Sequence, residues 1–316
     1  MKAAIQTVLG KLQPELLGHV QCHEHIWLDK GPSFEVNAAL CADDFDRSLQ
    51  ELQDYFAAGG RAIVDAQPGG FGRNAGALRR LSEASGVHII SVTGFHKLQF
   101  MERDAGLDKM SVEELTARFC ADITEGMIEP DGSRSPGRAG MVKAAFDPGA
   151  LEHPVYSRLM EAVAATAAAT GAPVIVHTEK NTSMPELLAF FAQRNVPADR
   201  ILICHLDRTN HNLDAHIEAL ETGCMLCFDS VHRYKYVSDA DERALIAALC
   251  ERGYDKQIVL ALDTTNQRLR AYHSPDMGLD YILTEFIDLL KQDGISEESI
   301  RRMCVENAAR ILPVMK

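Results

Sequence analysis

The chain has 316 residues, of which 46% are hydrophobic and 24% charged, which is ample for a large buried core. Its net charge of −13 argues against nucleic-acid binding, because such proteins need a basic surface. No apolar run approaches the ~20 residues that span a membrane, and residues 1–10 lack the apolar segment of a secretory signal peptide.

Strand-like and helix-like segments alternate along the chain. After an apolar stretch at residues 16–20 that leads into the first strand, further strands are predicted at 61–65, 87–93, 140–146, 173–177, 200–205, 224–228 and 257–263. Helices are predicted at 43–56, 75–85, 111–126, 155–170, 184–195, 213–222, 239–252 and 279–290, with a terminal helix at 297–308. Ser111 and Glu114 have the spacing of a capping box, and Gly171 is placed to end a helix.

Eight strands, each followed by a helix, predict the fold class. Most of the strands are continuous apolar runs, which is typical of parallel strands buried on both faces. Eight such units in a chain of this length favour an α/β protein with a (β/α)8 TIM barrel over an open sheet. Because no linker interrupts the pattern, we expect residues 1–316 to form a single domain.

The eight cysteines are too few for a disulfide scaffold in a chain of this length. Cys224 and Cys227 have the spacing of a zinc-binding pair, but no second pair lies at the required distance. In apolar, strand-like segments such cysteines are expected to pack as small hydrophobic residues. Reduced cysteines and the lack of a signal peptide together predict a cytoplasmic location.

His23 and His25 flank Glu24 at the first strand. Residues two apart in a strand point to the same side, so both histidines can face one metal ion while Glu24 turns away. A single His-x-His pair also arises by chance. What strengthens the metal interpretation is the set of polar residues on the other strands.

Four more potential ligands lie on strands or at their ends: Lys143, His177, His205 and Asp263. The last three close apolar runs, in Val-Ile-Val-His177, Leu-Ile-Cys-His205 and Leu-Ala-Leu-Asp263. One such residue alone is more often a structural strand terminus. In a TIM barrel, however, the carboxyl ends of all strands meet at the face that carries catalysis. Four imidazoles and a carboxylate exceed what one catalytic ion needs, and they suit two.

Lys143 is central to the choice between one ion and two. A charged amine on a buried strand beside divalent ions is strongly disfavoured, so the amine is expected to be neutral or modified. Reaction of neutral lysine with CO2 gives an anionic carbamate that can bridge two ions. The alternative is that Lys143 extends to the barrel mouth and pairs with an acid such as Asp147.

These residues resemble those of the phosphotriesterase-like branch of the amidohydrolase superfamily. The similarity runs nearly the full length, through Thr7-Val-Leu-Gly10, residues 18–25, Gly60-Arg-Ala-Ile-Val-Asp65, Thr93-Gly94-Phe95 and Asn307-Ala-Ala-Arg310. The resemblance implies that His23, His25 and Asp263 hold the more buried ion. It likewise implies that His177 and His205 hold the more exposed ion, with carboxylated Lys143 bridging the pair.

Two ions in such a site can share a water molecule and lower its pKa, which gives a bridging hydroxide at neutral pH. The more exposed ion would polarise the substrate's carbonyl or phosphoryl oxygen while the hydroxide attacks. Asp263 would then pass the proton to the leaving oxygen, or serve only as a ligand; the family resemblance implies both roles. We expect zinc, with manganese, cobalt and iron as alternatives that the same donors accept.

The loops after the strands carry the substrate preference. Many lactone-hydrolysing relatives carry tyrosine where His96 stands, and relatives often carry arginine where Asn266 stands. Both departures argue against an acyl-homoserine lactone. The loop cations are expected to rim the mouth and bind an anionic substrate: Lys97, Arg233, Lys235, Arg268 and Arg270. The alternative is that these are solvated charges paired with neighbouring acids such as Asp239.

We therefore predict a metal-dependent hydrolase of a small molecule, in first place a lactonase opening a small lactone that could be anionic and sugar-derived. The second hypothesis is a phosphotriesterase or another phosphoester hydrolase. A third is a barrel that binds a ligand without converting it, although six metal residues argue against it. A homodimer is the expected assembly.

Overall fold

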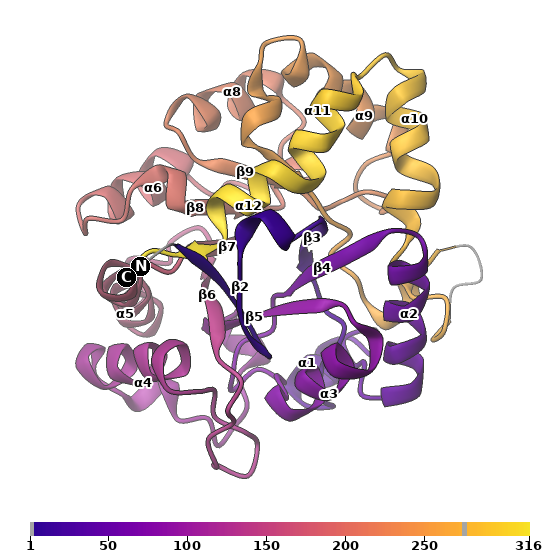
Figure 1. The fold of residues 1–316 in the computed structure, drawn as a ribbon. Coiled ribbons are helices and arrows are strands. Elements are labelled where there is room, and N and C mark those ends of the chain that lie inside the picture. The colour runs from indigo at the N-terminus through magenta and orange to yellow at the C-terminus, as the bar shows by residue number, and fades with distance from the viewer. Residues whose placement is uncertain (1–2, 274–276) are drawn as a thin grey trace.

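Eight parallel strands lie side by side in sequence order in the computed structural model, which describes residues 3–273 and 277–316. They are β3 (His19–Glu24), β4 (Gly60–Asp65), β5 (His88–Gly94), β6 (Ala139–Phe146), β7 (Val174–Thr178), β8 (Ile201–Cys204), β9 (Met225–Phe228) and β10 (Ile258–Leu260). Between β10 and β3 the ring is closed by the backbone N–H of Asp263, which donates to the carbonyl of His23 at 3.0 Å. The predicted (β/α)8 TIM barrel is confirmed (Figure 1).

Helices surround the strands on the outside of the barrel (Figure 1). They are α1 (Pro32–Val36), α2 (Phe45–Ala57), α3 (Ala75–Ser85), α4 (Val112–Thr124), α5 (Pro154–Thr170), α6 (Met184–Ala192), α7 (Leu206–Thr209), α8 (Leu213–Glu221), α9 (Asp239–Cys250), α10 (Ile287–Gln292), α11 (Glu297–Arg301) and α12 (Asn307–Ile311). The capping box of Ser111 and Glu114 starts α4 as predicted, and Gly171 ends α5 in the left-handed conformation. Among the described residues, no helix is long and apolar enough to cross a membrane.

The structure differs from the predicted elements in several places. The first barrel strand begins at His19, because the preceding residues 14–16 form a 3-10 turn. The predicted helices at 279–290 and 297–308 contain π-helical turns, at Ile282–Phe286 and Arg302–Glu306. The last strand ends at Leu260 rather than residue 263, and Asp263 itself adopts a positive φ of 48°.

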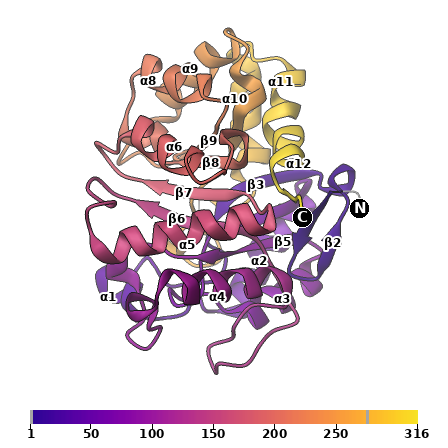
Figure 2. The same ribbon diagram turned by 90° about the vertical axis from the view of Figure 1, so that its left-hand side faces the viewer.

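A small antiparallel sheet that the sequence patterns did not predict covers one end of the barrel. It consists of β1 (Ala4–Thr7), β2 (Gly10–Leu12) and β11 (Pro313–Val314), and it joins the two ends of the chain. The two termini lie next to each other at that end in both views (Figure 1, Figure 2). The backbone N–H of Val8 donates to the carbonyl of Ile89 at 2.9 Å, which attaches this sheet to β5.

Apolar side chains fill two layers around the strands. One layer lies inside the barrel and contains Val20, Val64 and Ile175, and the other packs between the strands and the helices. Cys227 packs in the inner layer and Cys224 in the outer one, and both side chains are buried, as the packing interpretation predicted. This filled interior supports the polar side chains at the carboxyl ends of the strands.

Candidate metal centre

Five histidines, which lie on or just after four of the barrel strands, form a continuous array of rings at one end of the barrel. Ring centroids lie 5.4 Å apart for His25 and His23, 4.9 Å for His23 and His205, and 4.5 Å for His205 and His177. His96, from the loop after β5, extends the array, at 4.9 Å from His177. Each of these rings therefore contacts the next, and the four histidines of the strand-end pattern lie together at one end of the barrel.

His23, His25 and Asp263 converge on one point. Asp263 Oδ1 lies 3.3 Å from His25 Nε2 and 3.7 Å from His23 Nε2. Glu24 turns the other way, as the period of the strand predicted, and its carboxylate accepts backbone N–H groups of Leu262 and Thr264. The same glutamate therefore holds the segment that presents Asp263.

Lys143 lies at the centre of the array. Its side chain is fully buried, and its Nζ is 3.2 Å from His23 Nε2. Burial lowers the pKa of this amine below its ordinary value. The alternative that Lys143 extends to the mouth and pairs with Asp147 is wrong, because Lys143 is buried against His23, and the cation that approaches Asp147 is Lys97, at 3.9 Å.

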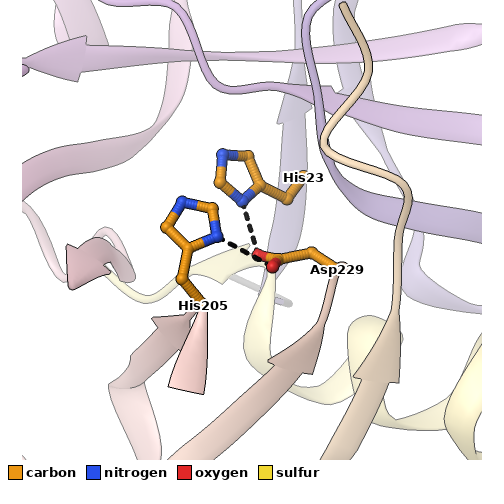
Figure 3. A group of neighbouring side chains, drawn as sticks. All are labelled: His23, His205 and Asp229. Carbon is orange, nitrogen blue, oxygen red and sulfur yellow. Dashed lines mark hydrogen bonds and ion pairs between the residues drawn. The ribbon is translucent and has the colours of Figure 1, made fainter. Parts of the chain in front are cut away.

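Asp229 at the end of β9 connects two of the histidines and was missed in the sequence. Its carboxylate accepts from His23 Nδ1 and from His205 Nδ1, each at 2.8 Å (Figure 3). Burial alone would raise the pKa of Asp229, but His205 and His23 outweigh it and hold the pKa well below its ordinary value. A carboxylate acceptor fixes the proton of each ring on Nδ1 and leaves Nε2 free to bind a metal. The signal was present, because Asp229 closes an apolar run as Asp263 does.

Two arginines meet the other oxygen of Asp263. Arg208 Nη1 donates to Asp263 Oδ2 at 2.8 Å, and Arg233 Nη1 contacts the same oxygen. Burial acts to raise the pKa of Asp263, but Arg233 and the neighbouring imidazoles lower it well below its ordinary value. Arg208 was not predicted, since it lies on α7 beyond the strand end, where no pattern distinguishes it from a surface arginine.

A separate carboxylate, that of Glu179, contacts His177. Glu179, two residues beyond it, accepts from His177 Nε2 at 3.0 Å and from Lys97 Nζ at 2.6 Å. The hydrogen bond from His177 and then the contact with Lys97 hold the pKa of Glu179 below its ordinary value. Lys97 is therefore engaged in an ion pair, as the alternative of paired loop charges proposed.

A cavity of about 230 Å³ opens above these residues. Five of the six predicted metal residues line it, all except the fully buried Lys143. Four of the six predicted substrate residues also line it: His96, Lys97, Arg233 and Lys235. Arg268 and Arg270 do not line it, so their predicted position at this mouth is corrected. Arg268 donates to the backbone carbonyls of Val231 and Leu262, and Arg270 pairs with Asp280 and Asp54.

The donor set suits divalent ions. His23, His25 and Asp263 each offer one ligand atom, and these atoms lie within 4.8 Å of one another. Imidazole nitrogen and carboxylate oxygen are donors that zinc and its neighbours accept. His25 Nδ1 is buried without a hydrogen-bond partner among the described residues. The buried amine of Lys143, with the Nε2 atoms of His23 and His25 close to the carboxylate of Asp263, forms the arrangement that bound cations and a carbamate would satisfy.

Comparison with known proteins supports this picture. A family model described as the Phosphotriesterase family matches residues 3–312. A phospho-furanose lactonase of Mycoplasmopsis synoviae is 32% identical over 97% of this chain and 91% of its own length. The crystal structure of an amidohydrolase from Mycoplasma synoviae superposes with a TM-score of 0.93 at 32% identity, over 99% of this chain and 93% of that one. A lactonase from Listeria monocytogenes superposes with a TM-score of 0.89 at 26% identity, over 99% of this chain and 100% of that one.

Proposed function

This chain belongs to the phosphotriesterase family, and on that premise we propose that it is a two-metal lactonase that opens a small phosphorylated sugar lactone. The enzyme class follows from its relatives, which are lactonases and phosphotriesterase-like hydrolases. The observation that carries the finer proposal is the arrangement of the cavity. Imidazoles and Asp263 form its floor, with the buried amine of Lys143 against His23, and the cations Arg233 and Lys235 line its wall.

Each metal has a set of residues to hold it. His23, His25 and Asp263 suit one ion, and His177 and His205 suit the other. Lys143 would bridge them after carboxylation, in which the amine adds to CO2 and the released proton leaves to solvent. When bound, the ions supply a water molecule of lowered pKa and a Lewis acid for the lactone carbonyl.

The residues of the chain would then complete ester cleavage. The bond between the lactone carbonyl carbon and the ring oxygen breaks, and a hydroxy acid is formed. Asp263 takes the proton of the attacking water and delivers it to the departing ring oxygen, as a base that becomes an acid. Asp229 keeps His23 and His205 in the tautomer that their role as ligands requires.

The anionic part of the substrate would meet Lys235 and the part of the Arg233 guanidinium that does not contact Asp263. Both lie on the loop after β9, and both line the cavity. Hydrogen bonds between charged groups contribute roughly 1.5–3 kcal/mol each. The name of the Mycoplasmopsis synoviae relative, a phospho-furanose lactonase, indicates a phosphate as this anion.

A substrate panel tests the proposal. The metal-loaded protein is assayed with a furanose 1,4-lactone 5-phosphate, the same lactone without phosphate, and an aryl phosphotriester. We expect the phosphorylated lactone to have the highest kcat/KM, at least about 10-fold above the neutral lactone. Faster cleavage of the phosphotriester would instead establish the alternative phosphoester hydrolase, and tight binding without turnover would establish a binding protein.

Replacement of Lys235 by methionine tests the phosphate contact. We expect Lys235→Met to raise KM for the phosphorylated lactone by about 10-fold, because one charged hydrogen bond is lost. The KM for the neutral lactone and both kcat values should stay the same. Lys180→Met, which removes an exposed lysine on the loop after β7, is the matched control. Equal effects of Lys235→Met on both lactones would contradict a phosphate-binding role.

A further inference from the structure

Lys97 is directed at a carboxylate rather than into free space in the cavity. Its Nζ lies 2.6 Å from Glu179 Oε1 and 3.9 Å from Asp147 Oδ1. These groups come from the loops after three successive strands, β5, β6 and β7. The ammonium group therefore balances the charge of two acids before any substrate arrives.

Glu179 connects this lysine to the metal centre. The oxygen that accepts from Lys97 also accepts from His177 Nε2, at 3.0 Å. An ionised carboxylate can only accept, so His177 carries its proton on Nε2, and its lone pair is on Nδ1. The nitrogen that His177 can offer to a metal is thereby selected.

The backbone around Glu179 is held in place. The N–H of Glu179 donates to Thr182 Oγ1 at 3.0 Å, and the N–H of Thr182 donates to the carbonyl of Glu179 at 3.1 Å. The hydroxyl of Thr182 also donates to the carbonyl of Phe146 at 3.1 Å, which ties the turn to the end of β6. Because this turn already restrains the Glu179 backbone, its carboxylate can orient a neighbouring ring at little further cost in conformational entropy.

We propose that Glu179 is a positioning residue that orients His177 for its metal ion, and that Lys97 acts by holding Glu179. This inference rests on the proposed metal-dependent function. Glu179 would fix the tautomer and orientation of His177, as Asp229 does for His23 and His205. Lys97 would then support the metal centre rather than bind substrate. Partners of ligating histidines of this kind typically contribute about 10- to 100-fold to metal affinity.

Asp147, His177 and Glu179 could themselves be considered as a further cation site, since their ligand atoms lie within 4.8 Å of one another. The ammonium group of Lys97 already lies against two of the three. A positioning role accounts for the shared oxygen of Glu179 without a further ion, and it predicts no increase in bound metal when Lys97 is removed.

Metal retention tests the proposal without any substrate. Metal-loaded Glu179→Ala, Glu179→Gln and Lys97→Met are titrated with a chelator, and bound metal is measured by elemental analysis. We expect Glu179→Ala to bind one of the two ions about 10- to 100-fold more weakly, with a smaller loss for Glu179→Gln, whose amide oxygen still accepts the N–H of His177. The double variant Glu179→Ala/Lys97→Met should lose no more than Glu179→Ala alone, because both changes act through one ring.

Exposed residues nearby supply the controls. Glu186→Ala on α6 and Lys180→Met should retain metal like the unmodified protein, and thermal unfolding confirms that each variant is folded. Retention of both ions by Glu179→Ala at unchanged affinity would overturn the positioning role. Fully additive losses would overturn the link between Lys97 and Glu179.

Lactone kinetics separate the two roles of Lys97. A supporting role predicts that Lys97→Met lowers kcat by the same factor for phosphorylated and neutral lactones. An increase in KM for the phosphorylated lactone alone, with metal retention unchanged, would assign Lys97 to the substrate and overturn the proposal. If the unmodified protein opens no lactone, the proposed function fails, but the chelator titration still decides the role of Glu179.

Discussion

Replacement of Lys143 by methionine is expected to abolish binding of the metal pair and to lower kcat/KM for the phosphorylated lactone by more than about 1,000-fold, the scale of losing a main electrostatic catalyst. Methionine has nearly the length of lysine but cannot take up CO2. The measurement combines metal content with lactone hydrolysis. In the unmodified protein, 13C NMR in labelled bicarbonate should also show a carbamate that Lys143→Met lacks.

Thermal unfolding separates this effect from loss of the fold. Lys143 is fully buried, and its Nζ contacts an imidazole, that of His23, rather than an acid. Because an apolar group is the less costly occupant of such a position, the variant should unfold at the same temperature as the metal-free protein or higher. A Lys143→Met protein that keeps two ions and full activity would refute the bridging role.

Replacement of Asp229 by asparagine should have the next largest effect. The carboxylate accepts from two imidazoles at once, but an asparagine side chain offers one accepting oxygen and one donating amide. One of His23 and His205 would then lose its acceptor or its tautomer. We expect metal affinity to fall about 10- to 100-fold for each histidine affected, and up to about 10,000-fold if both losses multiply.

Chelator titration followed by metal analysis measures this loss. Asp214→Asn on α8 is the matched control, because it makes the same chemical change at an exposed position. Excess metal should restore part of the activity of Asp229→Asn, since the ligands themselves remain. Unchanged metal affinity in Asp229→Asn would show that the histidines are positioned by their strands alone.

The barrel and most of the residues on the floor of the cavity could be predicted because they depend on local sequence patterns. The strand predicted at 173–177 is β7 (Val174–Thr178), and His177 lies at its end. In a closed parallel barrel all such ends meet, so knowledge of the fold brings together residues that are far apart in sequence. This is why His23, Lys143 and Asp263 could be placed in one site before any distance was known.

Hydrogen bonds between a metal-site side chain and its supporting residue depend on distances that sequence periodicity does not encode. Asp229 has the same strand-end pattern as Asp263, but only the structure shows that its carboxylate lies between two rings. Long side chains are harder still to place. Arg270 was expected at the cavity, yet Asp54 and Asp280 draw its guanidinium away from it. The small sheet of β1, β2 and β11 was missed because its partners come from opposite ends of the chain.

The most direct test of the account is a zinc titration of metal-depleted protein in bicarbonate buffer, with hydrolysis of the furanose 1,4-lactone 5-phosphate as the measured rate. The account predicts that activity rises mainly with the second equivalent and reaches its plateau at two ions per chain. Full lactone hydrolysis by the metal-free protein, or a plateau at one ion per chain, would contradict it.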